Sequence, residues 1–372
     1  MPLGPLDDTL SHQTPDTFDT VFTSDRRFYD RYYFNCHPSA DDLFLITGMG
    51  QYPNLGVTDA FVTISHGHTH YVVRSSRELG RDRSNTVVGP LGVEVVEGLR
   101  ELRVWCEPNE WNLDFELTFR GAAPALHEPK GTSWLGNRQM EETSRFAQVG
   151  TWEGRISVGG QEYTVTPDRW KGARDHSWGF RPGVGEPEPP GIAAKVGPQG
   201  RLGFFHQWIP MQFEDYMIKV FMQEDHEGNR LMEEAVRVHN YGGKEEHEDL
   251  GKPSHDIQFK TGTREIEKAV ISFSDSDLTV TNTPLRTNYL AAGSGYAPTP
   301  EWAHGMYQGE LVVQGLTFDM SDPEVFASMQ GLNETLCRFE ASNGDVGFGM
   351  HENALSGIYR PYGFETPEAV AP

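Results

Sequence analysis

The chain has 372 residues, and its 54 acidic side chains outnumber 31 basic ones, which gives a formal net charge of −23. This charge repels nucleic acid and anionic membrane surfaces, so we expect neither as a partner. With 37% hydrophobic and 23% charged residues, the chain can bury a core, and its length suggests about two domains. We find no secretory signal pattern and no apolar run long enough for a transmembrane helix, and we expect no membrane insertion.

Residues 1–24 are polar and rich in Pro, Thr and Asp, and we expect a flexible N-terminal arm. From about residue 40, short segments rich in Val, Ile, Phe, Thr and Trp alternate with Gly, Pro, Asn and Asp, which is typical of β-strands and turns. The predicted strands of the first half are 60–65, 69–74, 92–96, 102–107, 112–119, 154–158 and 163–166. Clean alternation over 112–119 places Leu and Phe on one face and polar residues on the other.

The second half continues the same pattern. Its predicted strands are 202–209, 216–223, 230–238, 265–273, 277–281, 309–313 and 336–340, with one short helix over 323–330 capped by Ser321 or Asp322. Many short strands and almost no helical periodicity predict an all-β protein with two consecutive lipocalin-like barrel or sandwich domains. The Pro- and Gly-rich stretch 182–191 is interpreted as a linker or as a long loop over a pocket mouth. We therefore predict a first domain over 25–186 and a second over 187–365.

The segment from Arg174 to Arg181 carries the strongest chemical signal, because it combines two arginines, an acid, an imidazole and an indole. If 174–178 is extended, Arg174, His176 and Trp178 share one face, and Asp175 lies on the other. The imidazole can move protons near neutral pH, and the indole can stabilise a developing cation. In an irregular turn, Asp175 itself becomes a candidate acid. The structural alternative is a buried Asp–Arg pair with Trp178 plugging the barrel end.

Two further segments repeat the combination of His with aromatic residues. Alternation over 203–208 places Phe204, His206 and Trp208 on one face, which predicts a second His–Trp ladder lining the same cavity; edge-strand His with core aromatics is the alternative. The segment 301–309 carries Trp302, His304 and Tyr307 and predicts a polar patch from the second domain, with His351 and Glu352, unless it only packs at an interface.

The spacing of His66, His68 and His70 would suit a metal site on a strand, but Gly67 favours a solvated turn, so we expect no metal. The chain lacks the nucleophile-elbow, phosphate-loop and zinc-protease motifs, and no βαβ unit surrounds its glycines. We therefore expect no cofactor. Cys36, Cys106 and Cys337 are sparse and far apart, which indicates reduced thiols and a cytoplasmic location.

The arrangement of two β-domains, with Asp175-His176-Ser177-Trp178-Gly179 closing the first, resembles the AttH/CrtC/Svf1 lipocalin-like superfamily, which includes carotenoid 1,2-hydratases. Weaker similarity extends to 207–213 with the following Tyr216, and to 347–352. The resemblance implies that His176 and Trp178 line a cavity. The acid and tyrosine that the family contributes from the following strand do not transfer cleanly, because this chain has His206, Trp208, Gln212 and Tyr216 there.

Residues and resemblance together predict a cofactor-independent hydratase or dehydratase acting on a lipophilic small molecule. His176, Asp175 and His206 are the candidate catalytic residues. The candidate substrate-binding residues are Trp178, Trp208, Gln212, Tyr216, Phe204, Arg174, Trp302, His304 and Tyr307. Two alternatives stay open: an isomerase or pericyclase in the same pocket, and a non-catalytic carrier of hydrophobic ligands. A homodimer is compatible with each.

Overall fold

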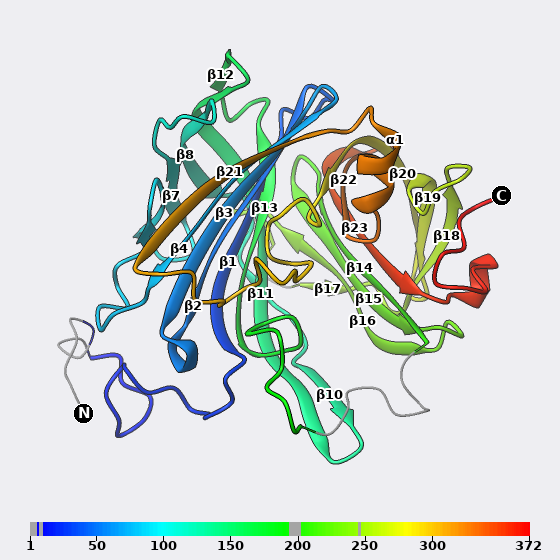
Figure 1. The fold of residues 1–372 in the computed structure, drawn as a ribbon. Helices are drawn as coiled ribbons and strands as arrows, with labels where there is room; N and C mark the ends of the chain where they lie inside the picture. The colour runs from blue at the N-terminus through cyan, green and yellow to red at the C-terminus, as the bar shows by residue number, and fades with distance from the viewer. Residues whose placement is uncertain (1–5, 7–9, 193–201, 245–246) are drawn as a thin grey trace.

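A computed structural model describes residue 6 and the ranges 10–192, 202–244 and 247–372. Nearly all regular structure in these ranges is β, in two antiparallel sheets that stand side by side (Figure 1). The first sheet is a nearly closed barrel and the second a half-barrel, which confirms the predicted all-β, lipocalin-like architecture.

The first sheet runs in the order β21 (Leu311–Asp319), β4 (Thr69–Glu78), β3 (Val57–His66), β2 (Leu43–Tyr52), β1 (Phe28–Cys36), β13 (Lys171–Phe180), β11 (Arg138–Val158), β8 (Leu113–Gly121), β7 (Glu101–Cys106), β6 (Leu91–Glu97) and β5 (Val87–Val88). Three short strands, β9 (Leu126–His127), β10 (Gly131–Leu135) and β12 (Gln161–Val165), also pair with the long β11.

The second sheet runs in the order β17 (Glu248–Asp249), β16 (Arg230–His239), β15 (Tyr216–Asp225), β14 (Gly203–Gln212), β23 (Val346–Gly357), β22 (Asn333–Ala341), β20 (Ser276–Tyr289), β19 (Ile266–Phe273) and β18 (Pro253–Phe259). Helix α1 (Pro323–Ser328) begins where predicted, because the Asp322 carboxylate accepts hydrogen bonds from the backbone N–H groups of Glu324 and Val325. The regular structure also includes the 3-10 turns Pro53–Leu55 and Arg360–Tyr362.

One strand does not follow the chain order. Strand β21 comes from the predicted second domain but pairs with β4 at the edge of the first sheet, and it crosses in front of the blue strands in Figure 1. The predicted boundary between 186 and 187 therefore does not divide the chain into two separate sheets. The last part of the Pro- and Gly-rich stretch runs up to residues 193–201, which lie outside the described residues.

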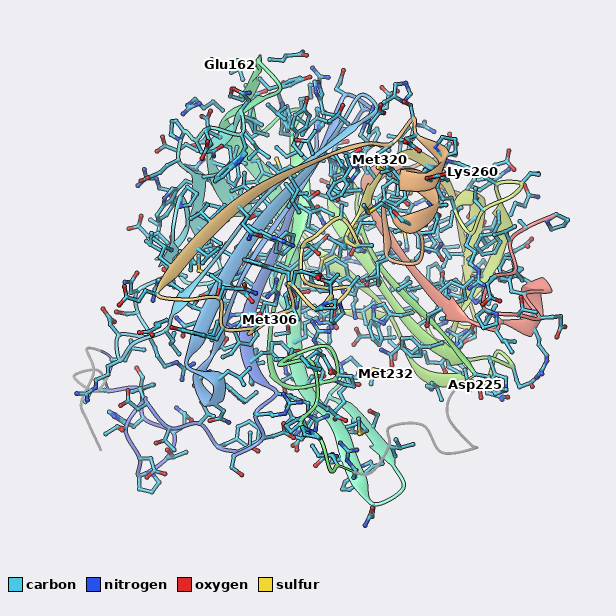
Figure 2. The ribbon with its side chains drawn as sticks, in the orientation of Figure 1. Glu162, Asp225, Met232, Lys260, Met306 and Met320 are labelled. Atoms are coloured by element: carbon cyan, nitrogen blue, oxygen red, sulfur yellow. The ribbon has the colours of Figure 1, made fainter. Side chains whose placement is uncertain are left out.

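Three of the apolar clusters lie inside the first sheet, between the two sheets and inside the second sheet. Figure 2 draws the side chains of both sheets. The alternation of β1 explains the first two clusters, since Phe34 packs inside the first sheet and Tyr33 packs toward the second. On β14, Trp208 packs between the sheets and Ile209 inside the second. Strands β1, β13, β14 and β23 therefore present their side chains to both sides.

Candidate functional site

The two faces of β13 open onto different pockets. Asp175 and Ser177 line a cavity of about 630 Å³ between the two sheets. His176 points the other way and lines a smaller pocket of about 250 Å³ at the first sheet. Glycine is required at position 179, where the strand continues past this point. Its φ of +127° disfavours other residues, and a Cβ there would lie 2.0 Å from the Glu142 carbonyl oxygen.

The larger cavity takes side chains from both sheets and from two connecting segments. Its polar and aromatic lining from the first sheet comes from Arg31, Tyr33, Glu141, Arg145, Asp175, Ser177 and the adjoining Arg181. The second sheet contributes Phe204, His206, Trp208, Gln223, Glu334 and Glu352, and Tyr296 and Leu332 come from the connections. A pocket of this size with aromatic walls and a few polar groups is typical of a small-molecule site.

Asp175 is held at this cavity beside a single guanidinium. The Nε atom of Arg145 lies 3.9 Å from Oδ2 of Asp175, and Nη1 of the same arginine lies 3.6 Å from Oε2 of Glu128. Burial raises the pKa of Asp175 to about 6, although Arg145 acts in the opposite direction. The Asp175 carboxyl can therefore exchange a proton close to neutral pH.

A pair of carboxyl groups faces Asp175 from the second sheet. Glu334 and Glu352 are direct partners in the register of β22 and β23, which places their Cβ atoms about 5 Å apart. Burial raises the pKa of Glu334 well above its ordinary value, and the neighbouring Glu352 adds to the shift. Burial acts in the same direction on Glu352, but His206 and Arg145 outweigh it and lower its pKa. A proton bound by this pair therefore favours Glu334 over Glu352.

His206 orients the ionised member of this pair. Its Nε2 lies 3.2 Å from Oε2 of Glu352, and its Nδ1 lies 3.1 Å from Nε2 of Gln223. If the Gln223 amide donates to Nδ1, the imidazole carries its proton on Nε2 and donates it to Glu352. The Oε2 atom of the neighbouring Glu334 is buried and has no hydrogen-bond partner in the described residues.

A buried ionic cluster fixes the indole at the base of the cavity. Nε1 of Trp208 donates to Oε1 of Glu128 over 2.7 Å, and Lys219 lies 3.1 Å from the same oxygen. Burial would raise the pKa of Glu128, but Lys219 and Arg145 outweigh it and lower its pKa. The Trp208 ring is thereby locked against Tyr33, with their centroids 6.0 Å apart.

The predicted site residues fall into three groups. Asp175, Phe204, His206 and Trp208 come together at the cavity between the sheets. On the opposite face of β13, Nε2 of His176 lies 2.6 Å from Oδ1 of Asp30, its ring is 5.6 Å from that of Trp178, and Arg174 donates from Nε to Gln148 over 2.9 Å. The structure thus differs from the expectation that His176 and Trp178 share one cavity with His206, because β13 presents its odd-numbered residues to the second sheet.

The remaining candidates lie away from both pockets. Gln212 is buried at the end of β14, and the hydroxyl of Tyr216 donates to Asp345 over 2.6 Å. In the segment 301–309, Trp302 stacks 4.2 Å from the Arg74 guanidinium, while His304 is buried and lies 3.2 Å from the Ser294 carbonyl oxygen. Tyr307 is exposed.

The three histidines of the 66–70 segment diverge at the turn around Gly67. His66 Nε2 lies 2.8 Å from the Tyr163 hydroxyl, whereas His70 is buried beside Asn288. Among the residues that the structure describes, no group of three His, Cys, Asp or Glu side chains could hold a metal ion. In the same ranges, no helix is long and apolar enough to cross a membrane.

Sequence reasoning missed Arg31, Arg145 and Glu334 and placed Glu352 only in a secondary patch. Strand β1 and the first part of β11 were not predicted, and neither was the pairing of β22 with β23. The alternation of 333–341 could have placed Glu334 on one face, but the chain gives no signal that β23 lies beside it.

The fold and the cavity define a two-sheet, lipocalin-like β protein with a large cavity between the sheets. The chain belongs to the family described as a family of unknown function (DUF8625), whose model matches residues 3–365. No curated protein matches the sequence.

One solved structure shares the architecture, and two others show a weaker similarity. An AttH candidate from Nitrosomonas europaea is 13% identical, with a TM-score of 0.53 over 89% of this chain and 93% of that one. Kievitone hydratase from Nectria haematococca is 13% identical, with a TM-score of 0.46 over 88% of this chain and 89% of that one. CghA bound to Sch210972 is 9% identical, with a TM-score of 0.48 over 90% and 89%. The predicted resemblance to AttH/CrtC-like proteins is confirmed, and at these identities it concerns the fold.

Proposed function

We propose that the protein is a cofactor-independent hydro-lyase, which adds water to, or removes it from, a lipophilic small molecule bound between the two sheets. The observation that carries this proposal is the pair formed by Glu334 and Glu352. Two neighbouring carboxyls whose surroundings separate their pKa values supply a proton donor and a proton acceptor at the same pH.

Glu334 acts as the acid. Burial disfavours its charged form, so it holds its proton to a higher pH than an ordinary carboxyl, and Oε2 has no partner in the described residues that would compete for a ligand. In the dehydration direction its proton passes to the hydroxyl of the substrate, the C–O bond breaks, and water leaves. If the reaction is instead a hydration, with the alkene of its substrate placed at Glu334, the same proton adds to an alkene carbon, and the electron pair of the double bond forms the new C–H bond.

Glu352 acts as the base. Its ionised carboxylate is positioned by His206 over 3.2 Å and can accept a proton from the attacking water during hydration. In dehydration it accepts the proton from the carbon next to the cation, and the electrons of that C–H bond form the alkene. Asp175, with a pKa of about 6, can return protons to this pair across the cavity.

Aromatic rings supply the rest of the chemistry. Phe204, Trp208 and Tyr33 line the cavity and present π-faces that stabilise a carbocation by about 0.5–2 kcal/mol. They also give the lipophilic part of a substrate an apolar surface, while the buried Glu128 holds the indole in one orientation.

The test combines substrate search and mutagenesis. Wild-type protein is incubated with hydrophobic extracts of bacteria and plants, and products that differ from a component by one water are identified by mass spectrometry. Once a substrate is found, Glu334→Gln should lower turnover by about 10²–10⁴-fold, because the amide cannot donate an acidic proton. Glu340→Gln makes the same exchange at the exposed end of β22 and should keep parental turnover.

The outcomes separate the proposal from its alternatives. Parental turnover in Glu334→Gln and Glu352→Gln would overturn acid–base catalysis by this pair. If Trp208→Ala alone lost turnover, the pocket would act through its shape and aromatic walls, as an isomerase or pericyclase does. Stoichiometric binding of hydrophobic compounds with no product in any extract would indicate a non-catalytic carrier.

A further inference from the structure

A tyrosine ring at the cavity is flanked by two guanidiniums. The Cζ atom of Arg31 lies 5.2 Å from the ring centroid of Tyr296, and that of Arg181 lies 5.7 Å from the same centroid. Both arginines line the cavity. The acid–base pair of the proposed mechanism does not use either of them.

Arg31 has free donors although it is deeply buried. Only 2% of its surface is exposed, and its Nη1 is occupied by the carboxylate of Asp59, 3.1 Å away, and by the hydroxyl of Tyr52. Its Nε and Nη2 atoms make no hydrogen bond of normal geometry in the described ranges, although the Tyr296 hydroxyl lies close enough to the guanidinium to help raise the pKa of Arg31. A buried donor without an acceptor costs about 1–3 kcal/mol, so an oxygen acceptor in the cavity would remove a real penalty.

Arg181 has a free charge. It stacks at 5.2 Å on the ring of Tyr29, and no carboxylate of the described residues lies within ion-pair distance of it. Arg145, at the same cavity, differs because Glu128 and Asp175 both lie within 4 Å of its guanidinium. The surplus positive charge of the cavity is therefore concentrated at Arg181.

Both arginines lie near the C-terminal end of β13. Arg31, on β1, is the register partner of Ser177, and Arg181 follows the end of β13 and is close enough to Glu352 to help lower its pKa. A ligand could thus place a charged end at the arginines and its reacting carbon at Glu334 and Glu352. A carboxylate matches the planar fork of a guanidinium and, with a single negative charge, is repelled less by the ionised Glu352 than the dianion of a phosphate monoester.

We propose that Arg31 and Arg181 form a subsite for the carboxylate of an amphipathic lipophilic acid, which is the substrate class of this protein. The conversion of this acid rests on the proposed hydro-lyase function, whereas its binding at the two arginines does not. The carboxylate would accept hydrogen bonds from Nε or Nη2 of Arg31 and an ion pair from Arg181, with its apolar chain along Phe204 and Trp208.

Binding of a matched probe pair tests the subsite without turnover. The fluorescent lipids cis-parinaric acid and its methyl ester share one chain and differ in the charge of the head group. At pH 7.5 the wild-type protein should bind the acid at least tenfold more tightly than the ester. Arg181→Gln should reduce this preference to less than threefold through weaker binding of the acid alone, and Arg181→Lys should restore part of it.

Arg103→Gln removes an arginine from the outer surface of β7, far from the cavity, and should keep the full preference. Equal binding of acid and ester by the wild type, or an unchanged preference in Arg181→Gln, would overturn the subsite but leave the hydro-lyase proposal intact. Failure to bind either probe would overturn the subsite together with the lipophilic cavity on which the proposed function depends. If both probes bind but the protein converts only a neutral substrate, the assigned substrate class would be wrong.

Discussion

The two faces of β13 carry similar chemistry in different surroundings. On one face, His176 pairs with Asp30 at 2.6 Å, and their side chains are 24% and 37% exposed. On the other, Asp175 is 15% exposed and lies near Arg145 between the sheets. Burial raises the pKa of Asp175 to about 6. Burial between the two sheets therefore lets this carboxyl keep a proton closer to neutral pH than a solvated aspartate does.

The arginines of the two faces give the largest expected contrast. Arg145→Met should destabilise the fold by about 3 kcal/mol, because Glu128 and Asp175 lose a buried counter-charge. The free energy of unfolding of Arg174→Met should stay within about 1.5 kcal/mol of the wild-type value. This variant loses one hydrogen bond, but it also removes a buried cation, and burial lowers the pKa of Arg174 to about 10. Urea unfolding at pH 7 measures both. Equal losses would show that the two faces do not differ in charge compensation.

The pH dependence of stability distinguishes the faces next. Asp175 has a higher pKa in the folded protein, about 6, than when unfolded, near 3.8, so the folded state binds more protons between these values. Its stabilising contribution is complete below pH 4 and is lost as pH rises through 6, by at most about 3 kcal/mol. Asp175→Asn should therefore flatten the decline between pH 4 and 6. Asp256→Asn, on the exposed side of β18, controls for the amide exchange.

Turnover separates the pockets once a substrate is known. Asp175→Asn should lower turnover by about tenfold or more, because a proton-exchanging group facing Glu334 is lost. His176→Asn changes the opposite face and should alter turnover by less than about threefold. The reverse order of effects would move the reaction to the pocket of about 250 Å³ that His176 lines with Asp30.

The smallest effect is expected outside both pockets. Tyr216→Phe removes a hydroxyl that donates to Asp345 over 2.6 Å, and it should cost about 1–2 kcal/mol in stability without changing ligand binding. Thermal unfolding and binding of cis-parinaric acid measure the two properties. Loss of binding in Tyr216→Phe would mean that the ligand reaches the far end of β14.

The alternation of single strands was available in the sequence. It placed Phe204, His206 and Trp208 on one face of β14 and separated Asp175 from His176 on β13, and Asp322 marked the start of α1. These features depend on neighbours in the chain, so local geometry determines them.

The pairing of strands determined which of these residues meet at the cavity. Only the tertiary structure turned the odd-numbered face of β13 toward the second sheet, placed β22 beside β23 so that Glu334 meets Glu352, and carried β21 back to the first sheet. These contacts join residues far apart in the chain, and their pKa shifts arise from burial that alternation alone does not reveal. The residue types of the site could therefore be read from the sequence, whereas their meeting in one cavity depends on the tertiary structure.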